Sequence, residues 1–165
     1  MPKMMSPNTT IWWIPKAGIA NIAAPTILEI NAGVNLSAAI ATGFTLAATD
    51  SDTDDSKTIV DEANVQTRTF GNYEGTLPFF RSDKTAVTAI FNTAYDLFKV
   101  GRVEGYLVSR HGKKATAAAA AGDEISVYHF ISDYGKTVEG DGGAPIQFEV
   151  PFLPQGNMTV NFKLV

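Results

Sequence analysis

The stretch TAVTAIFNTAYDLFKVGRVEGYLVSRHGKKATAAAAAGDEISVYHFI, residues 85–131, decides the fold because two periodicities meet in it. In its first part apolar residues recur at steps of three and four, the spacing of one face of an α-helix. We therefore predict a helix over about residues 85–100, capped by Asp83 and stopped by Gly101. Its packing face consists of Val87, Ile90, Phe91, Ala94 and Phe98.

Nearly all of the remaining chain alternates apolar and polar residues with the period of a β-strand. The segment Glu124–Ser132 differs, because it carries large apolar residues on both faces. A strand of this kind is covered on both sides, so we expect a second sheet or another subunit over it. The sequence predicts one domain over residues 1–165, mainly β, a β-sandwich or barrel with one flanking helix.

Other segments carry more local predictions. Thr26–Ile30 is interpreted as a strand, and Ile146–Phe152 and Met158–Val165 as a hairpin joined by Pro154, Gln155 and Gly156. The connectors Lys16–Ala24 and Val34–Thr49 are rich in small residues, so we expect them to become ordered against neighbouring subunits.

Composition limits the possible functions. The 165 residues include 17 acidic and 13 basic side chains, a formal net charge of −4, which disfavours a duplex-binding surface. The chain contains no cysteine, so it has neither disulfides nor thiolate metal ligands. We recognise neither a signal peptide nor an apolar run long enough for a membrane helix, and expect synthesis in a cytoplasm without membrane partners.

The acidic loop around residues 50–57 resembles the opening of an EF-hand, with Asp50, Asp52 and Asp54 at alternate positions. The sixth position of such a loop is glycine, whereas this chain has Asp55 there. We therefore favour a solvated loop or hairpin tip over a calcium site.

No catalytic constellation is recognisable. The two histidines, His111 and His129, lack the spacing of a zinc site, and we expect His129 to be buried and hydrogen-bonded in its strand. Glu104 and Glu149 could act as paired carboxylates only at a separation that sequence does not give. Trp12 and Trp13 could stack on a sugar or base, but we favour a role as anchors of the strand on a neighbour. We predict no catalytic, cofactor-binding or metal site.

The order of elements is an N-terminal arm, strands, an acidic loop, a strand pair and one helix. RVEGYLVSR (residues 102–110), the alanine-rich loop, GDEISVY (residues 122–128) and two final strands follow. This order resembles the major tail (tail tube) proteins of long-tailed, siphovirus-like phages, most of all those of actinobacteriophages. The resemblance is best over residues 57–165.

The resemblance implies a virion structural protein of the phage tail, without enzymatic activity, made and assembled in the host cytoplasm. Six copies would form a ring through shared sheet edges, and rings would stack into a tube that conducts the genome without binding it specifically. Its partners would be further copies of the chain, the tape measure protein, and tail tip or terminator proteins.

The same resemblance assigns roles by position. The arm Met1–Pro15 and the acidic loop would bridge rings, with contacts from Trp12, Trp13, Asp50, Asp52, Asp54 and Asp55. Because an acidic wall repels phosphate, the expected lumen-lining residues are Glu74, Glu104 and Glu149. The alternatives are a β-sandwich module binding carbohydrate or a host surface, a terminator or completion protein, and a hydrolase using paired carboxylates.

Overall fold

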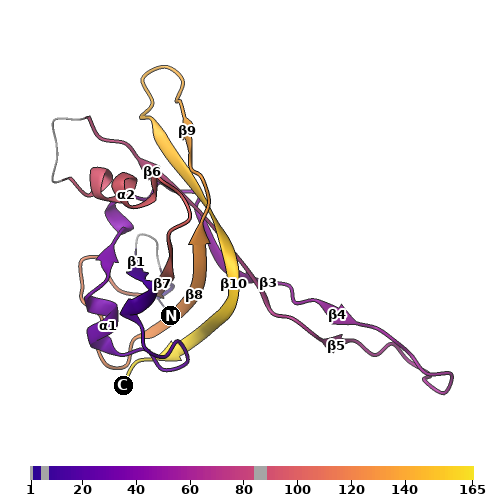
Figure 1. Cartoon of the computed structure of the whole chain (residues 1–165). Coiled ribbons are helices and arrows are strands. Elements are labelled where there is room, and N and C mark those ends of the chain that lie inside the picture. Colours follow the sequence, from indigo (N-terminus) through magenta and orange to yellow (C-terminus); the bar gives the residue numbers. More distant parts are fainter. Residues whose placement is uncertain (1, 5–7, 84–88) are drawn as a thin grey trace.

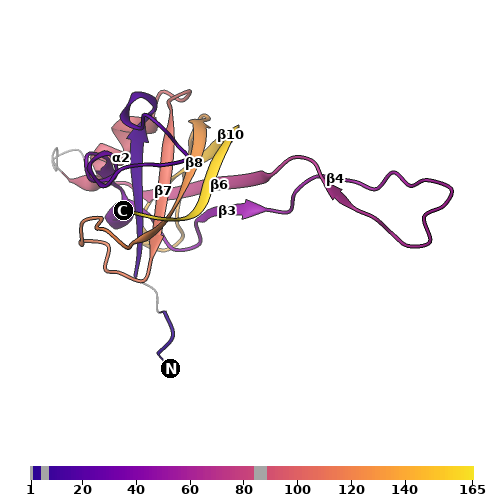
Figure 2. The ribbon, with the colours of Figure 1, turned by 90° about the horizontal axis from the view of Figure 1, so that it is seen from below.

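A computed structural model describes residues 2–4, 8–83 and 89–165. Its main element is an eight-stranded antiparallel sheet in the order β2-β1-β7-β8-β10-β6-β3, with β9 also paired to β10. The sheet is strongly curved, and a long hairpin leaves the body at its β3–β6 end (Figures 1 and 2). The chain is mainly β, as the sequence predicts, and is consistent with a β-sandwich.

The bounds of the elements are as follows. The large sheet contains β1 (Thr9–Pro15), β2 (Val34–Asn35), β3 (Thr45–Thr49), β6 (Asn72–Phe80), β7 (Glu104–His111), β8 (Glu124–Ser132), β9 (Lys136–Val138) and β10 (Gln147–Lys163). A second, two-stranded sheet consists of β4 (Thr53–Asp54) and β5 (Thr67–Arg68). The helical elements are α1 (Ile27–Asn31), α2 (Ile90–Phe98) and the 3₁₀ turns η1 (Lys16–Gly18) and η2 (Ser37–Ala39).

Strand β8 is buried on both faces, and the chain itself provides both covers. Tyr128 and Phe130 enter a larger core that also contains residues of β6, β10, η2 and α2. Ile125 and Val127 enter a smaller core on the opposite face, closed by Ile19 and other residues of the connecting segments. The expectation that these connectors become ordered against neighbouring subunits is therefore wrong, because they bury apolar side chains within their own protomer.

Helix α2 covers the larger core. Ala94 and Phe98 are fully buried, and Ile90 and Phe91 pack at the edge of the same core. The ring of Phe98 stacks on Phe79 at 5.6 Å. The helix begins at Ile90 after the N-cap Ala89, so Asp83 is not its cap; Val87, predicted for the same face, lies outside the described residues.

The predicted strand Thr26–Ile30 is wrong, because this segment forms helix α1. The Thr26 hydroxyl accepts from the backbone N–H of Glu29, while the Glu29 carboxylate accepts from that of Thr26. This capping box satisfies two amides at the helix start. Among the described residues the chain therefore has two α-helices, and α1 buries Ile30 in the smaller core.

The predicted C-terminal hairpin is also wrong, because β10 is one continuous strand. Its first part pairs with β6 and β9, and its second part pairs with β8. A bulge between Pro154 and Met158 takes the place of the turn, with Gly156 at φ +83°. The Tyr73 hydroxyl accepts from the amides of Gln155 and Asn157, which supplies partners that the ladder loses there.

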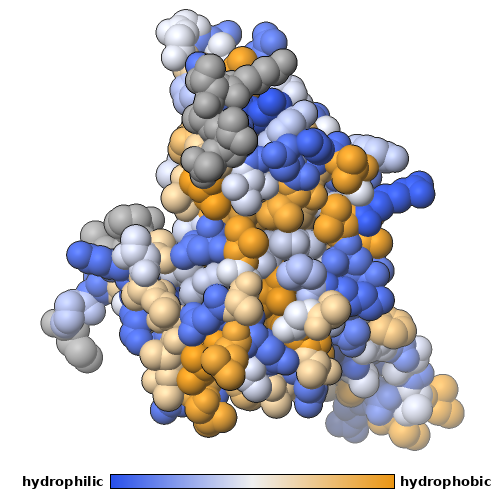
Figure 3. Space-filling model, turned by 60° about the vertical axis from the view of Figure 1, so that its left-hand side comes forward, coloured by the Kyte–Doolittle hydropathy of each residue, from blue (hydrophilic) through white to orange (hydrophobic). Residues whose placement is uncertain are grey.

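The surface on the side of the helices carries several separate apolar groups between polar and charged side chains (Figure 3). The exposed apolar residues are distributed over many elements, and four of them, Ile59, Val60, Val65 and Phe70, lie on the projecting hairpin.

Candidate functional site

The three acids predicted to line a lumen lie on one face of the large sheet. The register pairs Glu104 of β7 with Ile131, and Ile131 with Leu153 of β10. Glu149 lies on the same side of β10 as Leu153. Glu149 in turn pairs with Pro78 of β6, and Glu74 lies on the same side of β6 as Pro78. We call the part of this face around Glu74, Glu104 and Glu149 the acidic face. The smaller core covers only the neighbouring part of the same face, over β1, β7 and β8.

Glu104 is the most constrained of the three acids. Its carboxylate forms an ion pair with Lys16 at 2.7 Å and a hydrogen bond with His129 Nε2 at 2.9 Å. The hydrogen bond from Lys16 is the main reason that the pKa of Glu104 lies below its usual value, and the contact with His129 lowers it further. His129 is buried and its ring lies against Tyr106, as expected from the strand pattern. Glu104 is therefore ionised and held in place at neutral pH.

The other two acids are more open. Glu149 is half-buried and forms an ion pair with Lys136 across the β9–β10 pair at 3.0 Å. Glu74 is exposed near the start of β6. Glu104 and Glu149 are separated by two strand-to-strand spacings, from β7 over β8 to β10, and by the four residues between Leu153 and Glu149 along β10. These separations place the two acids on the order of 15 Å apart. That distance exceeds the range of about 9.5 Å for glycosidase carboxylates, so the paired-acid hydrolase has no geometric basis.

The acidic loop is part of a much longer hairpin. Residues 50–71, which we call the arm, run out along β4 and return along β5, away from the body in both ribbon views (Figures 1 and 2). Ten residues in each direction at about 3.3 Å per residue give a reach on the order of 30 Å. The sequence predicted the loop or hairpin tip around residues 50–57, whereas those residues form one side of the arm and its tip lies further along.

Two carboxylates of the arm are engaged by groups within the arm or at its base. Asp54 accepts from the amide and hydroxyl of Ser56, and these contacts lower its pKa. Asp52 accepts from the side-chain amide of Asn72. Asp50 and Asp55 are exposed. Within the described part of the chain, no three histidine or acidic side chains gather into a possible metal site.

The tryptophans are placed differently from the prediction. Trp12 and Trp13 lie on opposite faces of β1, and their exposed fractions are 3% and 1%. Trp12 is in the smaller core and Trp13 in the larger one, so neither offers surface to a neighbouring ring or to a sugar. Likewise Thr9–Pro15 of the predicted N-terminal arm is a central strand between β2 and β7.

Sequence reasoning missed Arg110, the buried centre of a polar network. Its guanidinium is 3.0 Å from the Asp123 carboxylate and also donates to Thr10 and to the backbone oxygens of Lys114, Ala117 and Ala118. Burial opposes ionisation of Asp123, but Lys113, the Ala120 amide and Arg110 together lower its pKa. An arginine on the strand face that also carries Tyr106 and Val108, followed by many alanines without side-chain donors, is the signal that could have revealed it. This network holds the alanine-rich loop against the sheet.

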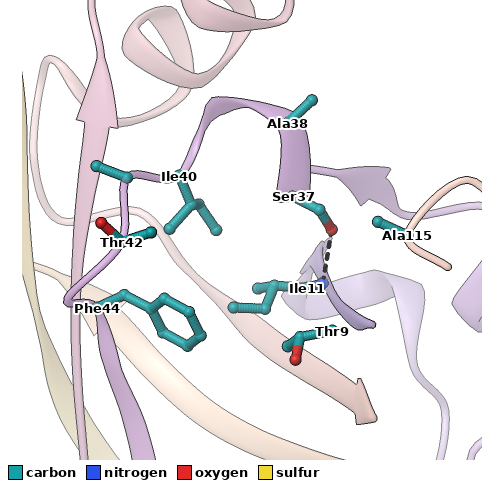
Figure 4. Close-up of a pocket in the computed structure, with 9 residues that line it drawn as sticks. Thr9, Ile11, Ser37, Ala38, Ile40, Thr42, Phe44 and Ala115 are labelled. Carbon is teal, nitrogen blue, oxygen red and sulfur yellow. Dashed lines mark hydrogen bonds between the residues drawn. The ribbon is translucent and has the colours of Figure 1, made fainter. Parts of the chain in front are cut away.

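An apolar pocket of about 220 Å³ lies beside this loop. Ile11, Ile40 and Phe44 turn toward it, while Ala38 and Ala115 lie at its border (Figure 4). The hydroxyl of Ser37 accepts from the Ile11 amide and donates to Asn35, so this hydroxyl at the pocket is already engaged.

A family model for phage tail tube proteins matches residues 1–165, the entire chain. The chain belongs to the phage tail tube protein family. It is therefore a structural component of the phage virion tail. No curated protein matches this tail tube protein. The resemblance seen in the sequence is confirmed at the level of the family, while the likeness to long-tailed phages of actinobacteria stays a prediction. No helix in the described ranges has the length and apolar character to cross a membrane.

Proposed function

We propose that this tail tube protein is the major tube subunit, which assembles with further copies into stacked rings of six whose lumen conducts the genome. The observation that carries the proposal is the acidic face, on which Glu74 is exposed and Glu104 and Glu149 are partly exposed. A soluble β-sandwich normally buries one sheet face and solvates the other, and here the solvated part gathers three acids.

The charges of the acidic face suit a wall along which DNA slides. Its three carboxylates outnumber Lys16 and Lys136, and each of these lysines is already paired with a glutamate. A lysine held by a carboxylate is a poor phosphate ligand, because neutralising a phosphate would require breaking the ion pair. The face therefore favours weak repulsion of the DNA backbone over binding.

The arm supports the stacking part of the proposal. A hairpin that extends on the order of 30 Å from the body can reach a subunit of the next ring. Asp50, Asp52, Asp54 and Asp55 would then contact that ring, and the tape measure and tail tip or terminator proteins would be the remaining partners. A second function as a sugar-binding module has no support, since both tryptophans are buried.

Electron microscopy of the purified protein and of virions tests assembly. Tubes with a central channel are expected, whereas rings that never elongate would favour a terminator or completion protein.

Charge reversal tests the lumen assignment. Glu149→Lys is expected to slow genome ejection while tubes still form, because it adds positive charge to the wall. Asp96→Lys, on the outer helix α2, is the matched control and should leave ejection unchanged. Equal ejection rates for the two variants would contradict a lumenal position of the acidic face.

A further inference from the structure

We propose that the apolar pocket beside the alanine-rich loop receives the tip of the arm from a second copy of the chain. This inference rests on the proposed self-assembly and names the two surfaces that would meet. The tip consists of Ile59, Val60, Asp61 and Glu62, two apolar residues followed by two acids.

The tip has the character of a binding segment. Ile59 is fully exposed and Val60 has an exposed fraction of 79%, which leaves two adjacent aliphatic side chains in solvent at the end of a projection. Within the described residues the tip is held by local contacts, such as the Asp61 carboxylate accepting from the Thr58 amide. Burial of these side chains on a partner would therefore cost little reorganisation.

The pocket matches the tip in size and polarity. Its volume of about 220 Å³ exceeds the roughly 150 Å³ that holds a benzene molecule in an engineered apolar cavity. One aliphatic side chain of the tip therefore fits. Ile11, Ile40 and Phe44 supply an apolar lining, and the Ser37 hydroxyl is already engaged in two hydrogen bonds.

Charge supplies the second match. The arm contains six acidic and two basic residues, a net charge of −4 that equals the charge of the whole chain. The rest of the chain is therefore balanced, with eleven residues of each sign. Beside the pocket, Ala115 follows Lys113 and Lys114; Lys113 pairs with Asp123, and Lys114 is exposed. With the apolar residues of the tip in the pocket, the two acids that follow them would lie near the exposed Lys114, so the charges of the two surfaces are complementary.

The occupant must come from another molecule. The arm leaves the body at the β3–β6 end and points away from it in both views, so its tip does not fold back onto its own pocket (Figures 1 and 2). A second copy supplies the same tip in solution or in a neighbouring ring, and a head-to-tail contact of this kind can be repeated from one copy to the next.

The absence of cysteine allows a direct test. Thr42→Cys at the pocket and Val60→Cys at the tip are made as separate variants with different tags, mixed and oxidised. A disulfide forms only where Cα atoms come within about 7 Å. The control replaces the Val60→Cys variant by Ala144→Cys, which carries an exposed cysteine outside the arm. We expect about tenfold more heterodimer between Thr42→Cys and Val60→Cys than between Thr42→Cys and Ala144→Cys. Equal yields would overturn the proposal.

A charge exchange tests the second match in the same assay. Lys114→Glu on the Thr42→Cys partner is expected to reduce the heterodimer about fivefold, and Glu62→Lys on the Val60→Cys partner to restore it. Loss without restoration would contradict the charge pairing. Tubes that form without preferential crosslinking would overturn this contact and leave the proposed function standing. Preferential crosslinking without any rings or tubes would support the contact and count against the tube.

Discussion

Replacement of Arg110 by methionine should destabilise the folded protein strongly. The guanidinium has an exposed side-chain fraction of 1%, and its partner Asp123 one of 4%. Methionine keeps much of the volume, but it leaves the backbone oxygens of Lys114, Ala117 and Ala118 without their donor. Removing one member of a buried ion pair costs about 3–5 kcal/mol. Because Lys113 continues to neutralise Asp123, we expect the lower end, about 3 kcal/mol.

Urea unfolding followed by tryptophan fluorescence measures this loss. Trp12 and Trp13 are buried, so their emission changes when the sheet unfolds, and the Arg110 guanidinium lies 5.0 Å from the Trp12 ring. With a slope of about 2 kcal/mol/M, a loss of 3 kcal/mol lowers the urea midpoint by about 1.5 M. The matched control is Arg68→Met on the exposed arm, for which we expect a change below about 0.5 kcal/mol.

Two outcomes would refute this reasoning. A change in the free energy of unfolding below about 1 kcal/mol would mean that the network contributes no more than a surface ion pair. If Arg110→Lys were as stable as the wild type, positive charge alone would be sufficient. The network instead requires the planar guanidinium, which can donate to several acceptors at once.

Three further predictions concern the sheet. Tyr73→Phe removes a hydroxyl that forms hydrogen bonds with three backbone groups of β8 and β10, and should lower the free energy of unfolding in urea by about 1–3 kcal/mol. Tyr128→Phe is the control, and an equal loss in that variant would show that the contacts to the bulge are not responsible. Because the folded-state pKa of Glu104 is lowered, its stabilisation is present above the unfolded pKa of about 4.3 and is lost as pH falls through the folded value. The melting temperature of wild type should therefore exceed that of Glu104→Gln at about pH 6 and approach it at about pH 3, and a gap that stays constant would contradict the ion pair. Gly105→Ala places a methyl 2.5 Å from a carbonyl oxygen of β1 and should cost about 1–3 kcal/mol by thermal unfolding; a stabilised variant would show that β1 yields readily.

The two cores explain why one prediction about assembly failed. Large apolar residues on both faces of β8 correctly indicated that both faces are covered. The sequence pattern does not identify the cover, because that depends on contacts between residues far apart in the chain. Ile19 of the small-residue connector and Ile30 of α1 supply part of it.

Local ambiguity explains the two errors in secondary structure. A glycine at positive φ serves a hairpin turn and a bulge equally well, so Gly156 could not distinguish them. The outcome depends on Tyr73, which is distant in sequence and bonds the bulge amides. At Thr26–Ile30, by contrast, the capping-box spacing of threonine and glutamate was present in the sequence and outweighs the strand-like run of apolar residues.

The sequence by itself determined the mainly β class, the helix ending before Gly101, the doubly apolar strand β8 and the family resemblance, because these follow from periodicity and element order along the chain. Tertiary structure alone decided that Glu74, Glu104 and Glu149 share one face, since this depends on strand order and register. It also decided that the tryptophans are internal and that the acidic loop belongs to a long arm. Charge and hydrophobicity are properties of residues, whereas the surface on which they act is a property of the fold.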